Sequence, residues 1–223
     1  MRRHPLLAAS YALACASWMS AQARTAPSPA ATPAPVPASP AERLESDEYT
    51  RYELLAPETA QFHILYEVTA IQPGATVFFN PIRKGSEASG ERVFDRMTGE
   101  ELKMEVVSGQ EARKTGLPRA DTEMDYIRIR LPRPVPSDGG QVRLLIEKTY
   151  KDPKSYSREG TTITFARPLG IKRNSVVLPA GYELVSCNFP SQVLTEADGR
   201  IAISFWNPGP DAAPLKLAAR KLP

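Results

Sequence analysis

The stretch that decides the fold is "QVRLLIEKTY", residues 141–150. Its apolar residues Val142, Leu144 and Ile146 alternate with the charged residues Arg143 and Glu147. Successive side chains of a β-strand point to opposite faces, so a period of two is typical of a strand with one buried face and one face in water. The stretch therefore predicts a strand that covers a hydrophobic core with one of its faces.

The same period of two recurs along most of residues 44–223. It is found in "ELKMEVV" (101–107), "YIRIRL" (126–131) and "RIAISFW" (200–206). Turn-forming residues interrupt it at Pro73-Gly74, Thr98-Gly99, Asp138-Gly139-Gly140, Pro179-Ala180-Gly181 and Asp198-Gly199. We expect about 11–13 short strands from this pattern. An all-β fold, an antiparallel β-sandwich, is the natural way to bury one face of so many strands.

Two local signals refine this expectation. Asp198-Gly199 lies between two strand-like runs and predicts a two-residue hairpin, because both residue types tolerate positive φ. No amphipathic stretch of helical length is found after the N-terminal segment, and "GQEARKTGL" (109–117) is the nearest candidate for a helix.

The first 23 residues have the pattern of a secretory signal peptide. Arg2 and Arg3 precede an uncharged run from Pro5 to Met19, and Ala21-Gln22-Ala23 supplies a small-x-small cleavage site. The run is shorter than the roughly 20 apolar residues of a transmembrane helix, so no membrane span is expected after cleavage. The sequence predicts a periplasmic or secreted protein. Lipid anchoring at Cys15 is the alternative, since "YALAC" resembles a lipobox.

Residues 24–43 are predicted to be a disordered linker. The stretch 24–41, "RTAPSPAATPAPVPASPA", is dominated by proline and alanine. Proline lacks an N–H and fixes φ, so this composition favours extended chain and cannot build a hydrogen-bonded core. Three segments follow: a signal peptide (1–23), a linker (24–43) and a β-sandwich domain (44–223).

Charge and cysteine content exclude several classes of function. The chain has 28 basic and 25 acidic side chains, and cleavage would remove two of the basic ones. This near balance argues against a nucleic-acid partner, which requires a sustained cationic surface. Cleavage would also leave Cys187 as the single cysteine, so no intrachain disulfide is expected. Cys187 shares its parity with Val185 and Phe189, which predicts a buried position near a strand end.

The side chains that catalysis or metal binding would need are scarce. His63 is the only histidine outside the signal segment, and in "AQFHILYEVTA" (60–70) it shares the polar face with Gln61 and Glu67. A zinc site needs three or four nitrogen or sulfur ligands. No calcium loop, G-x-S-x-G elbow or phosphate-binding glycine loop is found. No catalytic residue, metal or cofactor is predicted.

Two alternatives remain open, a carboxylate-based hydrolase and a carbohydrate-binding module, either acting on envelope polymers. The first would use strand carboxylates, but Glu67, Glu105, Glu147 and Glu183 all lie opposite the apolar face of their strands. The second would need exposed aromatic rings. The candidates are Tyr52, Tyr156, Tyr182 and Trp206.

A basic segment suggests a binding surface. Basic residues outnumber acidic ones between Lys148 and Arg173, and "KTYKDPKSYSREG" (148–160) predicts an exposed loop between two strands. Such a loop could meet an acidic envelope protein or another anionic envelope component. The candidate binding residues are Lys151, Lys154, Tyr156, Arg158, Lys172 and Arg173.

The order of several stretches resembles the β-rich N-terminal domain of the M1 family of zinc aminopeptidases, and a group of exported bacterial proteins that carry such a domain. The stretches are "YTRYELLAPETAQFHILYEVTA" (49–70), "DRMTGEELKMEVV" (95–107), "VRLLIEKTY" (142–150) and "ITFARPLGIKRNSVVLPAGYELVSCNFP" (163–190). The resemblance implies a saddle-like β-sandwich without a peptidase domain. The family's H-E-x-x-H and G-x-M-x-N motifs do not occur in the sequence, so no functional residue can be carried over. We expect a non-enzymatic exported binding or scaffold module of the bacterial cell envelope.

Overall fold

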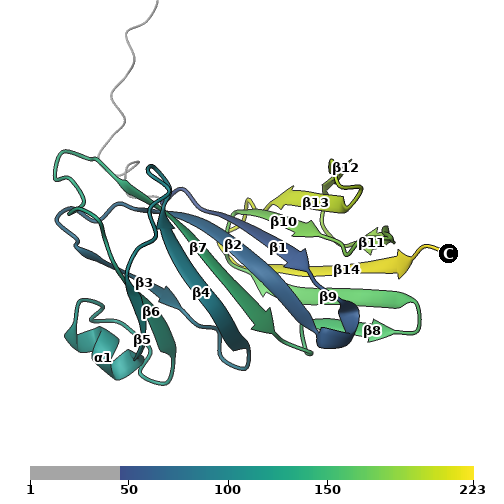
Figure 1. Ribbon diagram of the computed structural model, residues 1–223, viewed down its shortest axis with the longest axis horizontal. Coiled ribbons are helices and arrows are strands. Elements are labelled where there is room, and N and C mark those ends of the chain that lie inside the picture. Colours follow the sequence, from purple (N-terminus) through teal and green to yellow (C-terminus); the bar gives the residue numbers. More distant parts are fainter. Residues whose placement is uncertain (1–45) are drawn as a thin grey trace, which may run out of the picture. The chain divides into compact units, whose positions relative to one another are not determined.

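The computed structural model describes residues 46–223 (Figure 1). The signal peptide and linker expected at 1–23 and 24–43 lie outside the described residues. Within residues 46–223, no helix is long and apolar enough to cross a membrane.

The described residues form fourteen strands, one more than the upper end of the expected range, and two short helices. The strands are β1 Tyr49–Leu54, β2 Gln61–Ala70, β3 Val77–Pro81, β4 Glu87–Asp95, β5 Met104–Ser108, β6 Asp125–Arg130, β7 Val142–Lys151, β8 Tyr156–Glu159, β9 Thr162–Leu169, β10 Arg173–Val177, β11 Tyr182–Cys187, β12 Gln192–Thr195, β13 Ile201–Trp206 and β14 Ala213–Lys221. The helices are η2 Pro57–Thr59 and α1 Gly109–Lys114. Helix α1 begins in the one helical candidate of the sequence, and the Ser108 hydroxyl caps it by accepting a hydrogen bond from the Glu111 N–H at 3.3 Å.

The strands form three sheets. The large sheet has the order β12-β13-β10-β1-β2-β7-β4, the four-stranded sheet β11-β14-β9-β8, and the three-stranded sheet β3-β6-β5. All named neighbours are antiparallel except β1 and β10, which run parallel with Tyr49 beside Arg173. The predicted all-β, largely antiparallel sandwich is confirmed.

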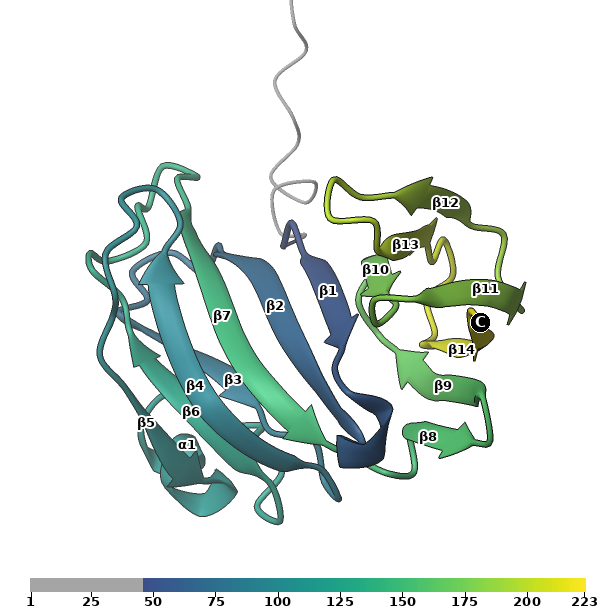
Figure 2. The ribbon, with the colours of Figure 1, turned by 45° about the vertical axis from the view of Figure 1, so that its right-hand side comes forward.

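One face of the large sheet packs against both smaller sheets, and all three share one hydrophobic core (Figure 2). In β2 the residues Phe62, Ile64, Tyr66 and Val68 are buried, while the residues that alternate with them from Gln61 to Glu67 are half-buried. Phe62 meets Phe165 of β9 edge-on, with ring centroids 5.3 Å apart and planes at 82°. This aromatic contact joins the large sheet to the four-stranded sheet.

His63 lies on the outer face of β2, as expected. Its Nδ1 is 3.3 Å from the Thr149 hydroxyl of the neighbouring strand β7. The imidazole thus belongs to the half-buried outer surface of the large sheet and not to the core.

Cys187 is half-buried and packs against the edge of the core, so its predicted position is confirmed in part. Its Sγ lies 3.4 Å from the Ser191 hydroxyl. The parity argument behind the prediction fails at Val185, which is 58% exposed. A β-bulge between Leu184 and Ser186 shifts the register of β11 against β14, so the residues on either side of the bulge no longer follow one alternation.

The hairpin at Asp198-Gly199 forms between β12 and β13, but its loop has three residues instead of two. The Glu196 N–H donates to the Arg200 carbonyl at 2.8 Å, and the Gly199 N–H donates to the Glu196 carbonyl at 3.0 Å. Gly199 adopts φ +81°, the left-handed conformation that completes a three-residue loop.

The aromatic contact between sheets generates a stability prediction. Phe165→Ala should lower the free energy of unfolding by about 3–5 kcal/mol, because it removes a fully buried ring at the junction of two sheets. Trp206→Ala is the control: this ring is 66% exposed, and its loss should change stability by no more than about 0.5 kcal/mol. Urea denaturation of both variants measures the difference. Equal effects would contradict the assigned core.

Candidate functional site

A lysine lies on the core-facing side of the large sheet. The buried positions of β7 are Val142, Leu144, Ile146, Lys148 and Tyr150, and Lys148 is only 5% exposed. The strand register places Lys148 beside Ile64 of β2. The alternation that predicts this strand therefore also directs one cationic side chain inward.

Lys148 has a neutral hydrogen-bond partner and no carboxylate partner. Its Nζ donates to the Asn80 Oδ1 at 2.6 Å and lies 5.1 Å from the Tyr150 ring centroid. Within residues 46–223 it forms no ion pair. The pKa of Lys148 is lowered to about 8, mainly by burial and also by the positive charge of the nearby Arg167, while the negative charge of Glu91 opposes both effects.

Arg167 is a second buried cation near Lys148, at 6% exposure. Its Nη1 lies 3.2 Å from the Asp152 Oδ2, and its guanidinium lies over the rings of Phe62 and Tyr150 at 5.2 and 5.3 Å. The same Asp152 oxygen accepts a hydrogen bond from the Ser155 hydroxyl at 2.7 Å. Burial, followed by the charge of Arg83, lowers the pKa of Arg167 from its usual value.

Lys148 and Arg167 line one cavity of about 200 Å³. All three sheets contribute to its wall: Ile64 from the large sheet, Asn80 from the three-stranded sheet and Arg167 from the four-stranded sheet. We call this cavity the basic pocket. Its lining residues are Thr50, Tyr52, Ile64, Tyr66, Asn80, Pro81, Arg83, Lys148, Tyr150, Arg167 and Ile171.

The lining of the basic pocket contains three cations and no carboxylate, imidazole or thiol. Asp152, which is outside the lining, compensates only Arg167. A buried charge without a counter-ion is costly, and a low local dielectric strengthens its attraction to any anion that enters. Chemically, the arrangement is suited to holding a small anionic group.

The basic residues predicted from the sequence do not converge. Arg173 pairs with Tyr49, which pairs with Glu67 at one end of β2. Lys151 pairs with Gln61 at the other end of β2. At 3.4 Å per residue, these two positions are separated by about 20 Å along the strand. The predicted candidates thus fall into two groups, with Lys172 next to Arg173 and the remainder next to Lys151.

Three of these candidates already form ion pairs with carboxylates. Lys151 lies 3.6 Å from Glu87, Arg158 lies 3.8 Å from Glu58, and Arg173 forms an ion pair with Asp47. Lys154 is exposed in the turn between β7 and β8. The ligand role of this set stays a prediction.

The prediction that residues 148–160 form one exposed loop is wrong. The segment contains the end of β7, all of β8, the turn between them, and Gly160 after β8. Tyr156 is fully buried, and its hydroxyl donates to the Leu55 carbonyl at 2.9 Å. In the turn, Pro153 and Lys154 are exposed as expected, but Asp152 is buried. The tyrosines on either side, Tyr150 and Tyr156, are core residues.

The exposed aromatic surface that a carbohydrate-binding module would need is also largely missing from the described residues. Of the four candidate rings, Tyr52, Tyr156 and Tyr182 are buried, and only Trp206 is exposed. The strand carboxylates do lie on the outer faces, as expected. Glu67 is 3.4 Å from Arg96 and Glu105 is 2.6 Å from Arg128. Within residues 46–223, no group of three or more His, Cys, Asp or Glu side chains could hold a metal ion.

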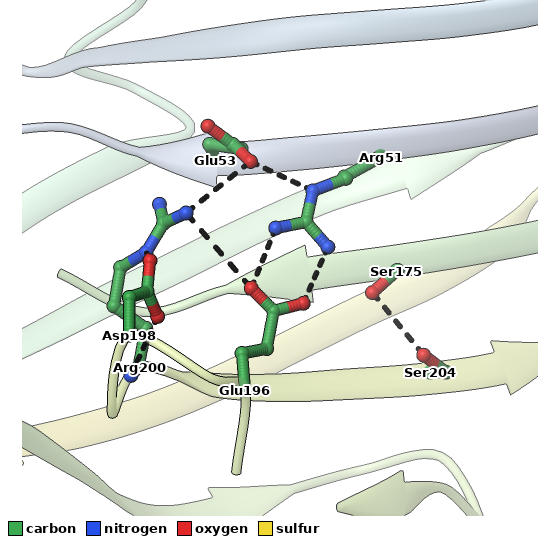
Figure 3. A network of polar contacts seen from close by, with 7 residues as sticks. All are labelled: Arg51, Glu53, Ser175, Glu196, Asp198, Arg200 and Ser204. Carbon is green, nitrogen blue, oxygen red and sulfur yellow. Dashed lines mark hydrogen bonds and ion pairs between the residues drawn. The ribbon is translucent and has the colours of Figure 1, made fainter. Parts of the chain in front are cut away.

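An ion-pair network on the outer face of the large sheet fastens the β12–β13 hairpin to β1 (Figure 3). Arg51 donates two hydrogen bonds to Glu196, at 2.6 and 2.7 Å, and a third to Glu53 at 2.7 Å. Arg200 lies 2.7 Å from Asp198 and 3.5 Å from Glu53. Every charge in this network has a partner, in contrast to Lys148, so the network is structural.

Lys148 and Arg167 were missed by sequence reasoning, which assigned charged residues to the wet face. A signal was present: Lys148 follows Val142, Leu144 and Ile146 at the same parity and precedes Tyr150. A charged residue in register with an apolar face indicates either a buried pair or a site.

The solved structures similar to this chain include M1 zinc metallopeptidases. They include the M1 zinc metallopeptidase from Deinococcus radiodurans, a mutant of that protein bound to a Tyr-Ser-Ala substrate, and a two-domain M1 zinc metallopeptidase mutant bound to L-tryptophan. Each is 13% identical to this chain, with a TM-score of 0.46, over 78% of this chain and 41% of the other. The alignment thus spans less than half the length of those proteins, and a likeness at this level says nothing about activity. No protein-family model and no curated protein matches the chain.

The hairpin network generates a prediction with a defined pH dependence. Hydrogen bonds from Arg51 lower the pKa of Glu196 from its usual value. A lowered folded-state pKa means that the stabilisation is present above the unfolded pKa of about 4.3 and is lost as the pH falls through the folded pKa. Glu196→Gln should therefore destabilise the protein by about 0.5–1 kcal/mol at pH 7, and this difference should disappear in acid.

The control for this variant is Glu159→Gln, an exposed glutamate that makes no ion pair within residues 46–223. Chemical denaturation at several pH values measures both variants. A Glu196→Gln effect that stays constant down to low pH would show that charge is not its cause.

The burial of Lys148 generates a second prediction, on stability. The folded pKa of about 8 lies below the unfolded value of about 10.4, so below pH 8 the lysine is charged in both states and burial penalises the folded one. Lys148→Met should therefore raise the free energy of unfolding at pH 7 by about 1–3 kcal/mol. Between about pH 8 and pH 10.4 the gain should shrink, because the native lysine loses its proton first.

Lys151→Met is the matched control for this variant, since it removes the same charge from the exposed end of the same strand. Its stability should stay within about 0.5 kcal/mol of the wild-type value. A Lys148→Met protein that is less stable than wild type at pH 7 would contradict the assigned desolvation penalty.

Proposed function

We propose that this protein is a non-enzymatic exported binding module of the bacterial cell envelope, and that it holds the anionic group of its ligand in the basic pocket. The observation that carries the proposal is the position of two cations, Lys148 and Arg167, both at least nine-tenths buried, on the wall of one cavity. Export and envelope location rest on the signal-like residues 1–23 and the Pro/Ala-rich segment behind them.

Physical chemistry supports an anion over a neutral ligand. Lys148 has three N–H donors, and within residues 46–223 the only side chain that accepts a hydrogen bond from them is Asn80. Desolvation of Lys148 is already part of the folded state, so a ligand anion would gain a strong charge-assisted interaction without adding that cost. Arg167, held by Asp152 and two aromatic rings, would attract the same anion from the neighbouring sheet.

The pocket chemistry supports binding over hydrolysis. Among its lining residues there is no pair of carboxylates and no nucleophile beside an imidazole base. Asp152, the carboxylate that pairs with Arg167, also accepts hydrogen bonds from Ser155 and Ser86. A structural role for this carboxylate accounts for all of its contacts.

The proposal is tested with benzoate against benzamide, its neutral isostere, by isothermal titration calorimetry at constant ionic strength. Benzoate should bind to the wild-type chain at least about 10-fold more tightly than benzamide, as one charge-assisted hydrogen bond in a desolvated site would give. Lys148→Met should abolish this preference. Lys151→Met and the double variant Lys154→Glu/Arg158→Glu should retain it, because these residues do not line the pocket.

The pH dependence of benzoate binding provides an independent readout. Lys148 carries its charge below its pKa of about 8, so affinity should fall several-fold between pH 7 and pH 9. Arg167, Arg83 and Tyr150 also face this lysine, and Glu91 acts on it from β4. Burial raises the pKa of Tyr150, so we expect Lys148 to be the group that titrates over this range. Equal affinity for benzoate and benzamide, or benzoate binding unaffected by Lys148→Met, would overturn the proposal.

A further inference from the structure

An amide side chain lies among apolar residues on the inner face of the three-stranded sheet. Asn80 is the one buried residue of β3, at 6% exposure, and it pairs in register with the fully buried Ile127 of β6. A polar side chain is costly at such a position unless its hydrogen-bonding groups find partners. Asn80 lines the basic pocket, so its amide lies within reach of both Lys148 and a ligand.

The orientation of this amide follows from its contact with Lys148. A lysine ammonium can only donate hydrogen bonds, so the carbonyl oxygen of Asn80 is the atom that faces the Lys148 Nζ, at 2.6 Å. The amide nitrogen Nδ2, with two N–H donors, is therefore fixed on the other side of the group, and within residues 46–223 it donates to no other residue. The buried side-chain atoms without a partner in that range are the Thr50 Oγ1 and the Asn174 Oδ1. The Asn80 Nδ2 is not among them, so it keeps accessible surface.

The free donors of Lys148 and Asn80 are close enough to hold one anionic group between them. The C=O and C–N bonds of an amide, about 1.23 and 1.33 Å long, place its oxygen and nitrogen about 2.3 Å apart. Together with the 2.6 Å contact, this places the Asn80 Nδ2 within about 5 Å of the Lys148 Nζ. Two donors at this separation match the two oxygens of one carboxylate, each at a normal hydrogen-bond length.

The neutrality of Asn80 decides whether the charge of Lys148 is available to a ligand. An aspartate at this position would have the same shape, and its carboxylate would pair with the lysine inside the protein. An amide accepts the same hydrogen bond but leaves the positive charge uncompensated. It also presents N–H donors where an aspartate would present a second negative oxygen. The side chain at position 80 thus favours entry of an anion in two ways.

We propose that Asn80 is a specificity-determining residue that makes the basic pocket selective for a carboxylate, with one oxygen on the Lys148 Nζ and the other on the Asn80 Nδ2. This inference rests on the proposed function and specifies the chemical class of the anionic group. An anion with a single charged oxygen would engage Lys148 and leave Nδ2 without a partner. Ile64, which lies beside Lys148 in the strand register, offers apolar surface to the hydrocarbon part of the ligand.

The test compares benzoate with pentafluorophenolate, an aromatic anion of similar size that has one charged oxygen and is ionised at pH 7. Asn80→Leu removes the N–H donors, keeps a similar volume and leaves Lys148 in place. Calorimetry on the full chain gives the ratio of benzoate affinity to pentafluorophenolate affinity. This ratio should fall by about 3- to 10-fold from wild type to Asn80→Leu, the range expected for one hydrogen bond. Because the two proteins are compared by this ratio, the difference in hydrophobicity between the ligands cancels.

Asn80→Asp is isosteric with the wild-type side chain and gives a second measurement. Its carboxylate should pair with Lys148 and occupy the anion site from within. Benzoate should therefore bind at least about 10-fold more weakly than to the wild-type chain, and no more tightly than benzamide. Asn188→Asp is the matched control, because Asn188 is exposed and does not line the pocket. It adds the same charge elsewhere and should leave benzoate affinity unchanged.

The outcomes separate this inference from the proposed function. Benzoate binding that depends on Lys148, with a ligand ratio that Asn80→Leu leaves unchanged, would overturn the role of Asn80 and leave anion binding in place. Wild-type affinity for benzoate in Asn80→Asp would overturn that role as well. Failure of both anions to bind to the wild-type chain would overturn both proposals.

Discussion

The constraint on which the rest of this structure depends is that one sheet of seven strands must bury a single face. No single partner sheet covers that face: the three-stranded and the four-stranded sheets each cover part of it. Aromatic rings close one side of the junction, where Phe62 packs against Phe165 and Tyr52. The basic pocket lies where residues of all three sheets meet, so its position follows from the way the large sheet is covered.

Charged groups at this junction are held by different means. Arg167 combines an ion pair with two aromatic contacts, an arrangement that compensates the burial of a planar cation. Lys148 is held only by the amide oxygen of Asn80 and by its contact with the ring of Tyr150. In the outer-face network of Arg51 and Glu196, by contrast, every charge is paired. The same fold therefore pairs its charges where their role is structural. The imbalance in the basic pocket is local.

Periodicity was sufficient to predict the fold class, because the alternation in β2 and β7 is a direct consequence of strand geometry. It was insufficient wherever a single residue departs from that geometry or where pairing is long-range. The bulge at Val185 reverses the facing of its neighbours, and nothing local in the sequence indicates it. The parallel pairing of β1 with β10 joins strands far apart in the sequence, and local sequence patterns do not indicate it.

The candidate site was harder to predict for the same reason. Lys151 and Arg173 were predicted to belong to one binding surface because both lie in a basic segment of the sequence. The strand register instead places them near different ends of β2. Lys148 and Thr50 are far apart in the sequence and meet across one cavity only once β1, β2 and β7 are in register. Tyrosine is ambiguous in sequence, and Tyr156 shows that its hydroxyl can be satisfied by one carbonyl inside a core.

The parallel pairing of β1 with β10 also has a kinetic meaning. The large sheet consists of β12, β13 and β10 on one side and β1, β2, β7 and β4 on the other, and only this pairing joins them. Tyr49 can find Arg173 only after the intervening chain, which includes β2 to β9, has been made and has closed into a long loop. Loops of this length cost entropy before any contact compensates it, and folds rich in such contacts fold slowly. The seam through the middle of the large sheet should therefore form among the last steps of folding, after local hairpins such as β12–β13.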